Sequence, residues 1–155
     1  MTIGIPASLQ IGRAIQTKLQ SAIPDVKFFA ERSDQEPLGD SEVPGVVIKM
    51  INVQISDNWS QGDYYWSSTI QFLVFGKMDG GQSIEAVNQM TVARIIAVLF
   101  GDGNETLDGI VEEIVPESMD FSEQASPDVG AAVLQFACNY RTPRGDPFTL
   151  LTASS

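Results

Sequence analysis

Histidine is absent from this chain of 155 residues, and cysteine occurs only once, as Cys138. Histidine is the usual general base and a common metal ligand, so its absence removes Ser-His and Cys-His nucleophile pairs. A single cysteine can form neither an intramolecular disulfide nor a thiolate metal cluster, as is typical of a reducing compartment. We therefore expect a protein that is not an enzyme and that has no cofactor or metal.

Basic residues are also scarce, with nine Lys and Arg against 20 Asp and Glu and a formal net charge of −11. Such a chain is unsuited to neutralising the phosphates of nucleic acids. The sequence has no signal-peptide pattern and no run near the roughly 18 apolar residues of a spanning helix. These features predict a protein made in the cytoplasm, with no membrane contact and no specific binding of DNA.

Hydrophobic residues make up 43% of the chain and charged residues 19%, which is typical of a folded protein of one domain. We expect this domain to span residues 1–142. Pro143, Gly145 and Pro147 interrupt regular structure near the C-terminus. Residues 143–155 are therefore predicted to form an extended C-terminal arm.

Two amphipathic helices are predicted from apolar residues repeated every three or four positions. The first covers residues 7–23, where Pro6 fits a first turn, Ser8 could cap the helix and Gly12 could mark a close backbone contact. The second begins after Ser83, a good capping residue, and continues to a glycine at position 101.

Alternating apolar and polar residues predict five strands, at 26–30, 46–55, 64–75, 109–115 and 131–141. A change of phase in the second strand predicts a β-bulge near Met50. Residues 116–130 are acidic and are predicted to be a linker. The order α-β-β-β-α-β-β predicts an α+β fold, in which both helices pack on one face of a mostly antiparallel sheet.

Three groups of residues invite a chemical interpretation. Glu112 and Glu113 are adjacent carboxylates, but neighbours on a strand point to opposite faces and cannot share an acid–base site. Cys138 falls on an apolar strand face, which favours a buried thiol over a nucleophile. Tyr64 to Trp66 could stack on a ligand, although packing is the commoner role of such residues in strands.

Charge is distributed unevenly along the chain, because no Lys or Arg occurs between Ile95 and Tyr140 while nine carboxylates do. This pattern predicts a strongly negative region. It fits either a solubilising face or a surface that repels passing DNA. Arg141 and Arg144 follow this region and could anchor the arm to an acidic neighbouring subunit.

The whole pattern over residues 7–142 resembles the tail terminator proteins of long-tailed bacteriophages, of the lambda-type minor tail protein family. The resemblance rests on the first helix ending at Ile23-Pro24, the segment Val43-Pro44-Gly45-Val46-Val47-Ile48 after an acidic loop, the strand Trp66 to Phe75, the helix Ser83 to Phe100, and the closing segment Asn139-Tyr140-Arg141-Thr142. This closing segment is also similar to other tail and neck proteins.

The resemblance implies a homohexameric ring in the tail or neck region of a virion. Such a ring stacks on the last subunits of the tail tube protein, stops their polymerisation and meets the head-tail connector, while DNA passes through the hole. The alternatives are a head completion or neck adaptor protein, and an acidic DNA-mimic binding protein.

In such a ring, two sets of residues are candidates for function. The first set would form a lumen that repels DNA: Glu112, Glu117 and Asp120. The second set would make contacts between subunits, with ordinary surface ion pairs as the alternative: Arg13, Lys18, Arg94, Arg141 and Arg144.

Overall fold

The computed structural model describes residues 4–31, 40–55, 63–77, 81–103, 105–121, 124–126 and 129–151. In chain order its elements are α1 (Ala7–Ala22), β1 (Lys27–Phe29), the 3-10 turn η1 (Asp40–Glu42), β2 (Gly45–Ile55), β3 (Asp63–Lys77), α2 (Ile84–Phe100), the 3-10 turn η2 (Gly101–Gly103), β4 (Glu113–Asp120), β5 (Gln124–Ser126) and β6 (Val129–Pro143).

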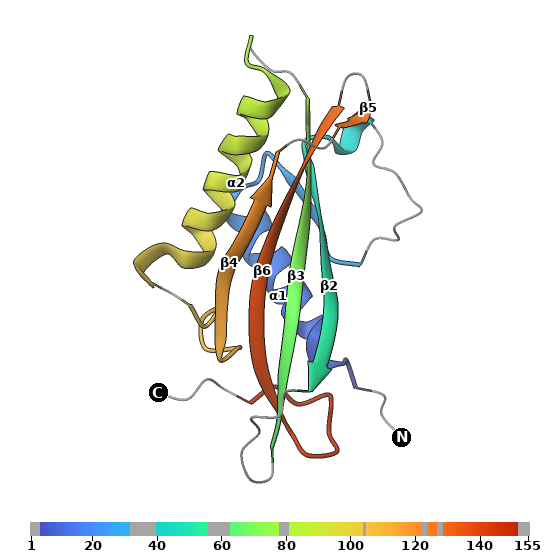
Figure 1. Cartoon of the computed structure of the whole chain (residues 1–155), viewed down its shortest axis with the longest axis vertical. Helices are drawn as coiled ribbons and strands as arrows, with labels where there is room; N and C mark the ends of the chain where they lie inside the picture. Colours follow the sequence, from blue (N-terminus) through green and yellow to red (C-terminus); the bar gives the residue numbers. More distant parts are fainter. Residues whose placement is uncertain are drawn as a thin grey trace.

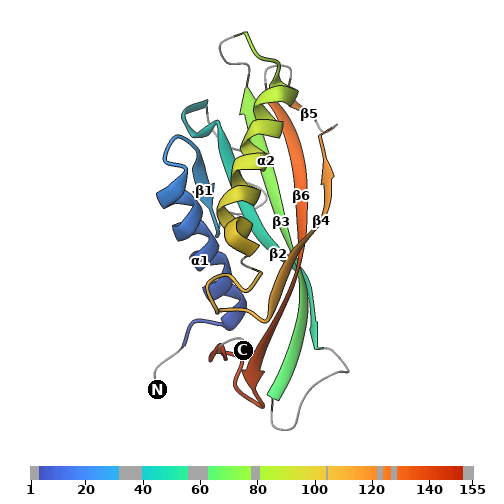
Figure 2. The same cartoon turned by 90° about the vertical axis from the view of Figure 1, so that its left-hand side faces the viewer.

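The strands form one sheet in the order β1-β2-β3-β6-β4, and the short β5 pairs with β6 (Figure 1). All neighbouring strands are antiparallel except β1 and β2. Both helices pack on the same face of this sheet (Figure 2). The predicted α+β class and the placement of the helices are thus confirmed. We call the covered side the helix face and the other side the open face.

The core lies between the helices and the sheet, where alternate residues of the two long central strands point inward. The even-numbered positions are buried from Ser68 to Gly76 in β3 and from Ala132 to Thr142 in β6, and Phe72 and Phe136 meet edge to face with ring centroids 5.0 Å apart. Above them α1 contributes Ile11, Ile15 and Leu19, which are fully buried because a spacing of four places them on one stripe of the helix.

The two helices begin differently. Ser83 caps α2 as predicted, since its Oγ accepts a hydrogen bond from the Ala86 amide (3.1 Å). In α1 the capping position is Pro6, which has no side-chain cap bond, so the expectation that Ser8 could cap this helix is wrong. Proline is well placed at a helix start because its fixed φ already matches a turn and no amide there needs a partner.

The bulge in β2 lies two residues beyond the predicted position. Met50 pairs regularly with Ile70, and the register shifts between Ile51 and Gln54. Asn52, within the shift, has a φ of 53°, a left-handed conformation that asparagine tolerates better than most residues. The change of apolar phase indicates that a bulge exists, but the backbone of Asn52 decides where it occurs.

The fourth predicted strand is displaced toward the C-terminus. Residues 107–109 all have positive φ and form a turn, so β4 begins at Glu113 and continues to Asp120. Part of the predicted linker 116–130 is therefore strand, and it also contains β5. Pro116 and the carboxylates interrupt the apolar alternation from which a strand is predicted. Such residues are tolerated on an edge strand, because one side of its backbone makes no hydrogen bonds to a neighbouring strand.

Part of the predicted C-terminal arm folds back on the domain. The Ala7 amide donates to the Pro147 carbonyl (2.8 Å), and the Leu151 amide donates to the Arg141 carbonyl (3.0 Å). Residues 144–151 therefore lie against the start of α1 and the end of β6 instead of extending away from the domain. Residues 152–155 lie outside the described part.

A substitution at Gly76 tests the contact between β3 and α2. A Cβ at this position would overlap Oδ1 of the buried Asn88, so we expect Gly76→Ala to reduce the free energy of unfolding by about 1–3 kcal/mol. The matched control is Gly101→Ala, whose Cβ would meet no atom of the described residues within 4 Å and should change stability by no more than about 0.5 kcal/mol. Urea unfolding followed by circular dichroism measures both, and equal effects would contradict this packing.

Candidate interaction surfaces

Glu112, the first residue of the predicted acidic lumen, is held within the subunit. It precedes β4, and its amide donates to the Asn139 carbonyl (2.8 Å). Its carboxylate accepts a hydrogen bond from Nε of Arg141, and only 13% of its side chain is exposed. The charge of Glu112 is thus compensated within its own chain.

Arg141 binds two carboxylates on the open face of the sheet. Besides Glu112, it contacts Asp63, with 3.0 Å between Nη1 and Oδ2. The hydrogen bond to Glu112 is the main cause of the raised pKa of Arg141. Tyr65 lies opposite Arg141 in the neighbouring strand, and burial raises the pKa of its hydroxyl. This cluster joins the start of β4 to the two central strands.

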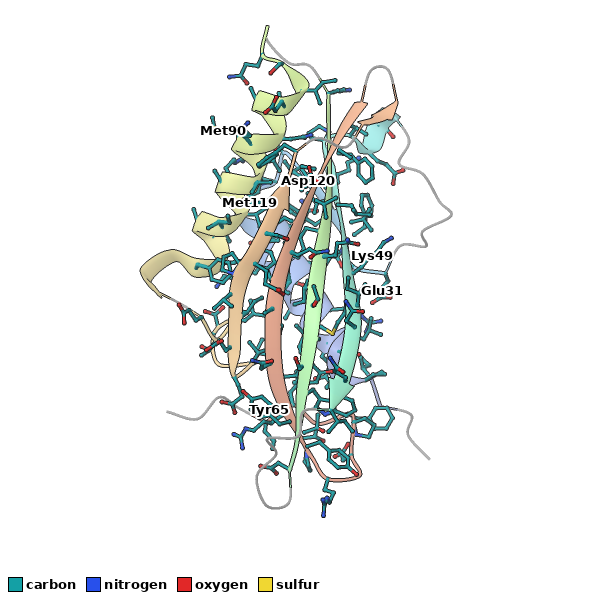
Figure 3. The ribbon with its side chains drawn as sticks, in the orientation of Figure 1. Glu31, Lys49, Tyr65, Met90, Met119 and Asp120 are labelled. Atoms are coloured by element: carbon teal, nitrogen blue, oxygen red, sulfur yellow. The ribbon has the colours of Figure 1, made fainter. Side chains whose placement is uncertain are left out.

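Glu117 and Asp120 differ from Glu112 because both are exposed. Glu117 lies where the register between β4 and β6 shifts, and Asp120 ends the strand (Figure 3). The structure therefore separates Glu112 from the other two residues. A role of Glu117 and Asp120 in repelling DNA stays a prediction.

Each of the five cations predicted to contact other subunits has a partner in its own chain. Arg94 and Asp25 form a bidentate pair (2.6 and 2.9 Å), which lowers the pKa of the carboxyl. The others are Arg13 with Glu31, Lys18 with Asp108 (2.8 Å), Arg141 with Glu112 and Asp63, and Arg144 over the ring of Tyr64 (5.9 Å). Their contacts with other subunits stay a prediction.

The aromatic residues at the start of β3 pack among themselves. Trp66 stacks on Tyr140 with 6.0 Å between ring centroids and an angle of 8° between planes. Its Nε1 donates to Thr142 Oγ1 (2.9 Å), and Tyr64 meets it edge to face. Burial raises the pKa of Tyr140 to about 12. These contacts match the packing interpretation of this segment.

Cys138 is a buried thiol, as its strand position predicted. It is fully buried, and the Ser68 hydroxyl donates to its carbonyl oxygen (2.9 Å). Burial raises the pKa of the thiol to about 12, because an apolar environment disfavours the thiolate. The thiolate required of a nucleophile is therefore scarce at neutral pH.

A pocket between α1 and the sheet was not anticipated from the sequence. It has a volume of 220 Å³ and is lined by Ser8, Leu9, Gly12, Ala30, Ile48, Lys49, Met50 and Ile70. Gly12 is the available signal in the sequence, but the contact it predicts, a close approach of a neighbouring backbone, is not the one found. Among the described residues, a Cβ at Gly12 would meet the Ala30 side chain alone, at 3.9 Å, so the glycine leaves space open instead.

The described residues offer neither a metal-binding cluster nor a membrane-spanning helix. Within them, no group of three or more Cys, Asp or Glu side chains is arranged to hold a metal ion. None of the helices formed by those residues has the length and apolar character needed to cross a membrane.

Comparison with known proteins gives a structural likeness only. No protein-family model and no curated protein sequence matches the chain. Among solved structures, it is similar to a chain of the "Virion of native gene transfer agent (GTA) particle", with a TM-score of 0.50 and 13% identity. The likeness covers 88% of this chain and 93% of the other. At this identity it shows that the two chains share a fold.

The ion pair of Glu112 can be tested against an exposed carboxylate of the same segment. Glu112→Gln weakens the hydrogen bond to Arg141 at a mostly buried site, so we expect a loss of about 1–2 kcal/mol in the free energy of unfolding. Glu117→Gln, the control, should change it by less than about 0.5 kcal/mol. Equal values from chemical denaturation would mean that the cluster around Arg141 does not stabilise the fold.

Cys138 provides a second test, by alkylation. Because its thiol is buried with a pKa of about 12, we expect iodoacetamide at pH 8 to modify the folded protein only as fast as it unfolds. The same protein in concentrated urea should be modified at the rate of a free thiol. Rapid labelling of the folded protein, followed by mass spectrometry, would refute the burial of Cys138.

Proposed function

We propose that this chain is a structural protein of a phage-like particle and that it acts as a tail terminator. In this role it forms a ring on the last subunits of the tail tube, stops their polymerisation and joins the tube to the head connector. The observation that carries the proposal is the fold, which extends over 88% of this chain and is shared with a chain of a virion. The sequence resemblance to tail terminators points to the same class.

The chemistry of the described side chains agrees with a structural role. The groups that most resemble catalytic residues are engaged in the fold: Cys138 is buried, and the carboxylate of Glu112 is bound by Arg141. We therefore propose that the protein is not an enzyme. Its partners would be further copies of itself, the tail tube protein and the head-tail connector.

DNA would pass through this ring without specific binding. Residues 105–121 contain six carboxylates and no Lys or Arg. Negative charge near a passing nucleic acid limits adhesion, because like charges repel at short range. Glu117, which is exposed, is the strongest candidate for such a surface.

Electron microscopy of particles made after disrupting the reading frame tests this function. A terminator stops tube growth, so we expect overlong tails that lack heads, beside filled heads that lack tails. Expression of the intact chain from a plasmid should restore tails of normal length. As a control, the same plasmid should carry a frame interrupted early in α1.

Two other outcomes would contradict the terminator role. Free tails of normal length beside filled heads would point to head completion or a neck adaptor. Intact, infectious particles would mean that the chain is no essential part of the virion.

A further inference from the structure

The sheet has two edges on opposite sides of the molecule (Figure 1). On one side, the ladder between β1 and β2 ends at the pair of Phe29 and Val47. We call residues 48–55, which continue beyond this ladder, the β2 edge. On the other side β4 is the last strand, and we call its residues 115–120 the β4 edge. A strand edge is a template for pairing with another chain.

The two edges lie at the same level along the strands, in the same rows of residues that pair across the sheet. Through β3 and β6, Ile48 aligns with Met119, and Lys49 aligns with Ser118. Met119 and Ile48 belong to the helix face, whereas Ser118 and Lys49 belong to the open face, because side chains alternate along a strand. Three successive antiparallel pairs separate β2 from β4, so these strands run in opposite directions. If a second copy is generated by rotation about an axis that runs along the strands, β4 of the first copy can therefore lie antiparallel to β2 of the second. The helix faces of both copies are then on the same side of the joined sheet.

Charge favours a contact between unlike edges. Residues 105–121, which include the β4 edge, carry six carboxylates and no cation. Pairing of β4 with β4 across a two-fold axis would bring these charges together. On the open face, Asp120 ends the β4 edge and Lys49 lies on the β2 edge, so the two residues belong to different edges of the sheet (Figure 3). Pairing of unlike edges brings these opposite charges together, and such a head-to-tail contact can close into a ring.

The helix face has a matching pair of features. Met119 is an apolar residue with 50% of its surface exposed. Beside the β2 edge lies the 220 Å³ pocket, whose lining includes Gly12 and Met50. A cavity of about 150 Å³ accommodates benzene, so this pocket has room for a methionine side chain. Burial of Met119 there would remove apolar surface from water.

We propose that copies of this chain join head to tail by pairing the β4 edge of one copy with the β2 edge of the next. Asp120 lies opposite Lys49, and Met119 enters the pocket beside Met50. This register is shifted by two residues from the common rows and keeps the faces matched. A stagger of this kind can close only if the strands are tilted relative to the ring axis, as they are in a β-barrel; with that tilt, the repeated joint closes a ring with a continuous sheet. The inference rests on the ring of the proposed function, and it assigns Asp120 to the joint instead of the lumen.

A disulfide placed across the joint tests this pairing. In the proposed register Ile51 lies opposite Ser118 on the open face. Within one chain these residues lie on strands three spacings apart and two rows from each other, so their Cα atoms are more than about 14 Å apart, whereas a disulfide needs Cα atoms within roughly 7 Å. Oxidation of the double variant Ile51→Cys, Ser118→Cys should therefore give a ladder of covalent oligomers on a denaturing, non-reducing gel.

The single variants are the matched controls. Ile51→Cys alone and Ser118→Cys alone should stay uncrosslinked, and a mixture of the two should give dimers but nothing larger. Cys138 is fully buried and should not react in any of them. Dimers from a single variant would show a two-fold contact and overturn the proposal. Oxidation of the folded double variant without any crosslink, with folding checked by circular dichroism, would also overturn it.

A second variant separates assembly from folding. Gly12→Leu fills the pocket, and the site has space for a side chain because a Cβ would meet, in the described part of the chain, Ala30 alone, at 3.9 Å. Replacing a glycine inside a helix should leave the unfolding midpoint unchanged or higher. We expect association of copies, measured by sedimentation velocity, to weaken at least tenfold. Association equal to that of the natural chain would contradict the position of Met119.

Failure of the joint and failure of the proposed function are distinguishable. A covalent ladder from the double variant, together with intact particles after gene disruption, would support the joint and contradict the terminator role. Overlong tails after disruption, without any ladder, would support the terminator role and contradict the joint.

Discussion

The pairing of β3 with β6 is the interaction on which the rest of the structure depends. The two strands are antiparallel neighbours along their full lengths, from Asp63 opposite Pro143 to Lys77 opposite Val129. Their helix face supplies the apolar layer that α1 and α2 cover. Their open face holds Arg141 between the carboxylates of Asp63 and Glu112. Because β2 pairs with β3 and β4 pairs with β6, the pairing of β3 with β6 also fixes the register of the two sheet edges and the face to which their side chains point.

The sequence correctly predicts the helices and strands that show a clear local pattern of apolar spacing or capping. The four-residue spacing of α1, the Ser83 cap of α2 and the alternation of β6 depend on local periodicity and capping, and all are confirmed. β4 was predicted, but too near the N-terminus, because the half of this edge strand beyond residue 115 lacks a full apolar alternation and contains Pro116. The phase change in β2 indicated a bulge but could not locate the left-handed residue, Asn52.

The candidate surfaces were harder to predict than the fold, for a physical reason. Counting charge along the chain located the acidic segment, but it could not show that Arg141 lies beside Glu112, because these residues meet only through strand register. The pocket beside Gly12 likewise depends on how α1 sits over β2. The two edges of the sheet carry different charges, so a contact between copies joins unlike edges. Head-to-tail contacts of this kind suit a ring whose two faces differ.

Cryo-electron microscopy of the intact particle tests the central claim most directly. Our account predicts a ring of copies of this chain between the last tail-tube subunits and the head connector, with β4 of each copy beside β2 of the next. Density for this chain elsewhere in the particle, or its absence from the particle, would contradict the account.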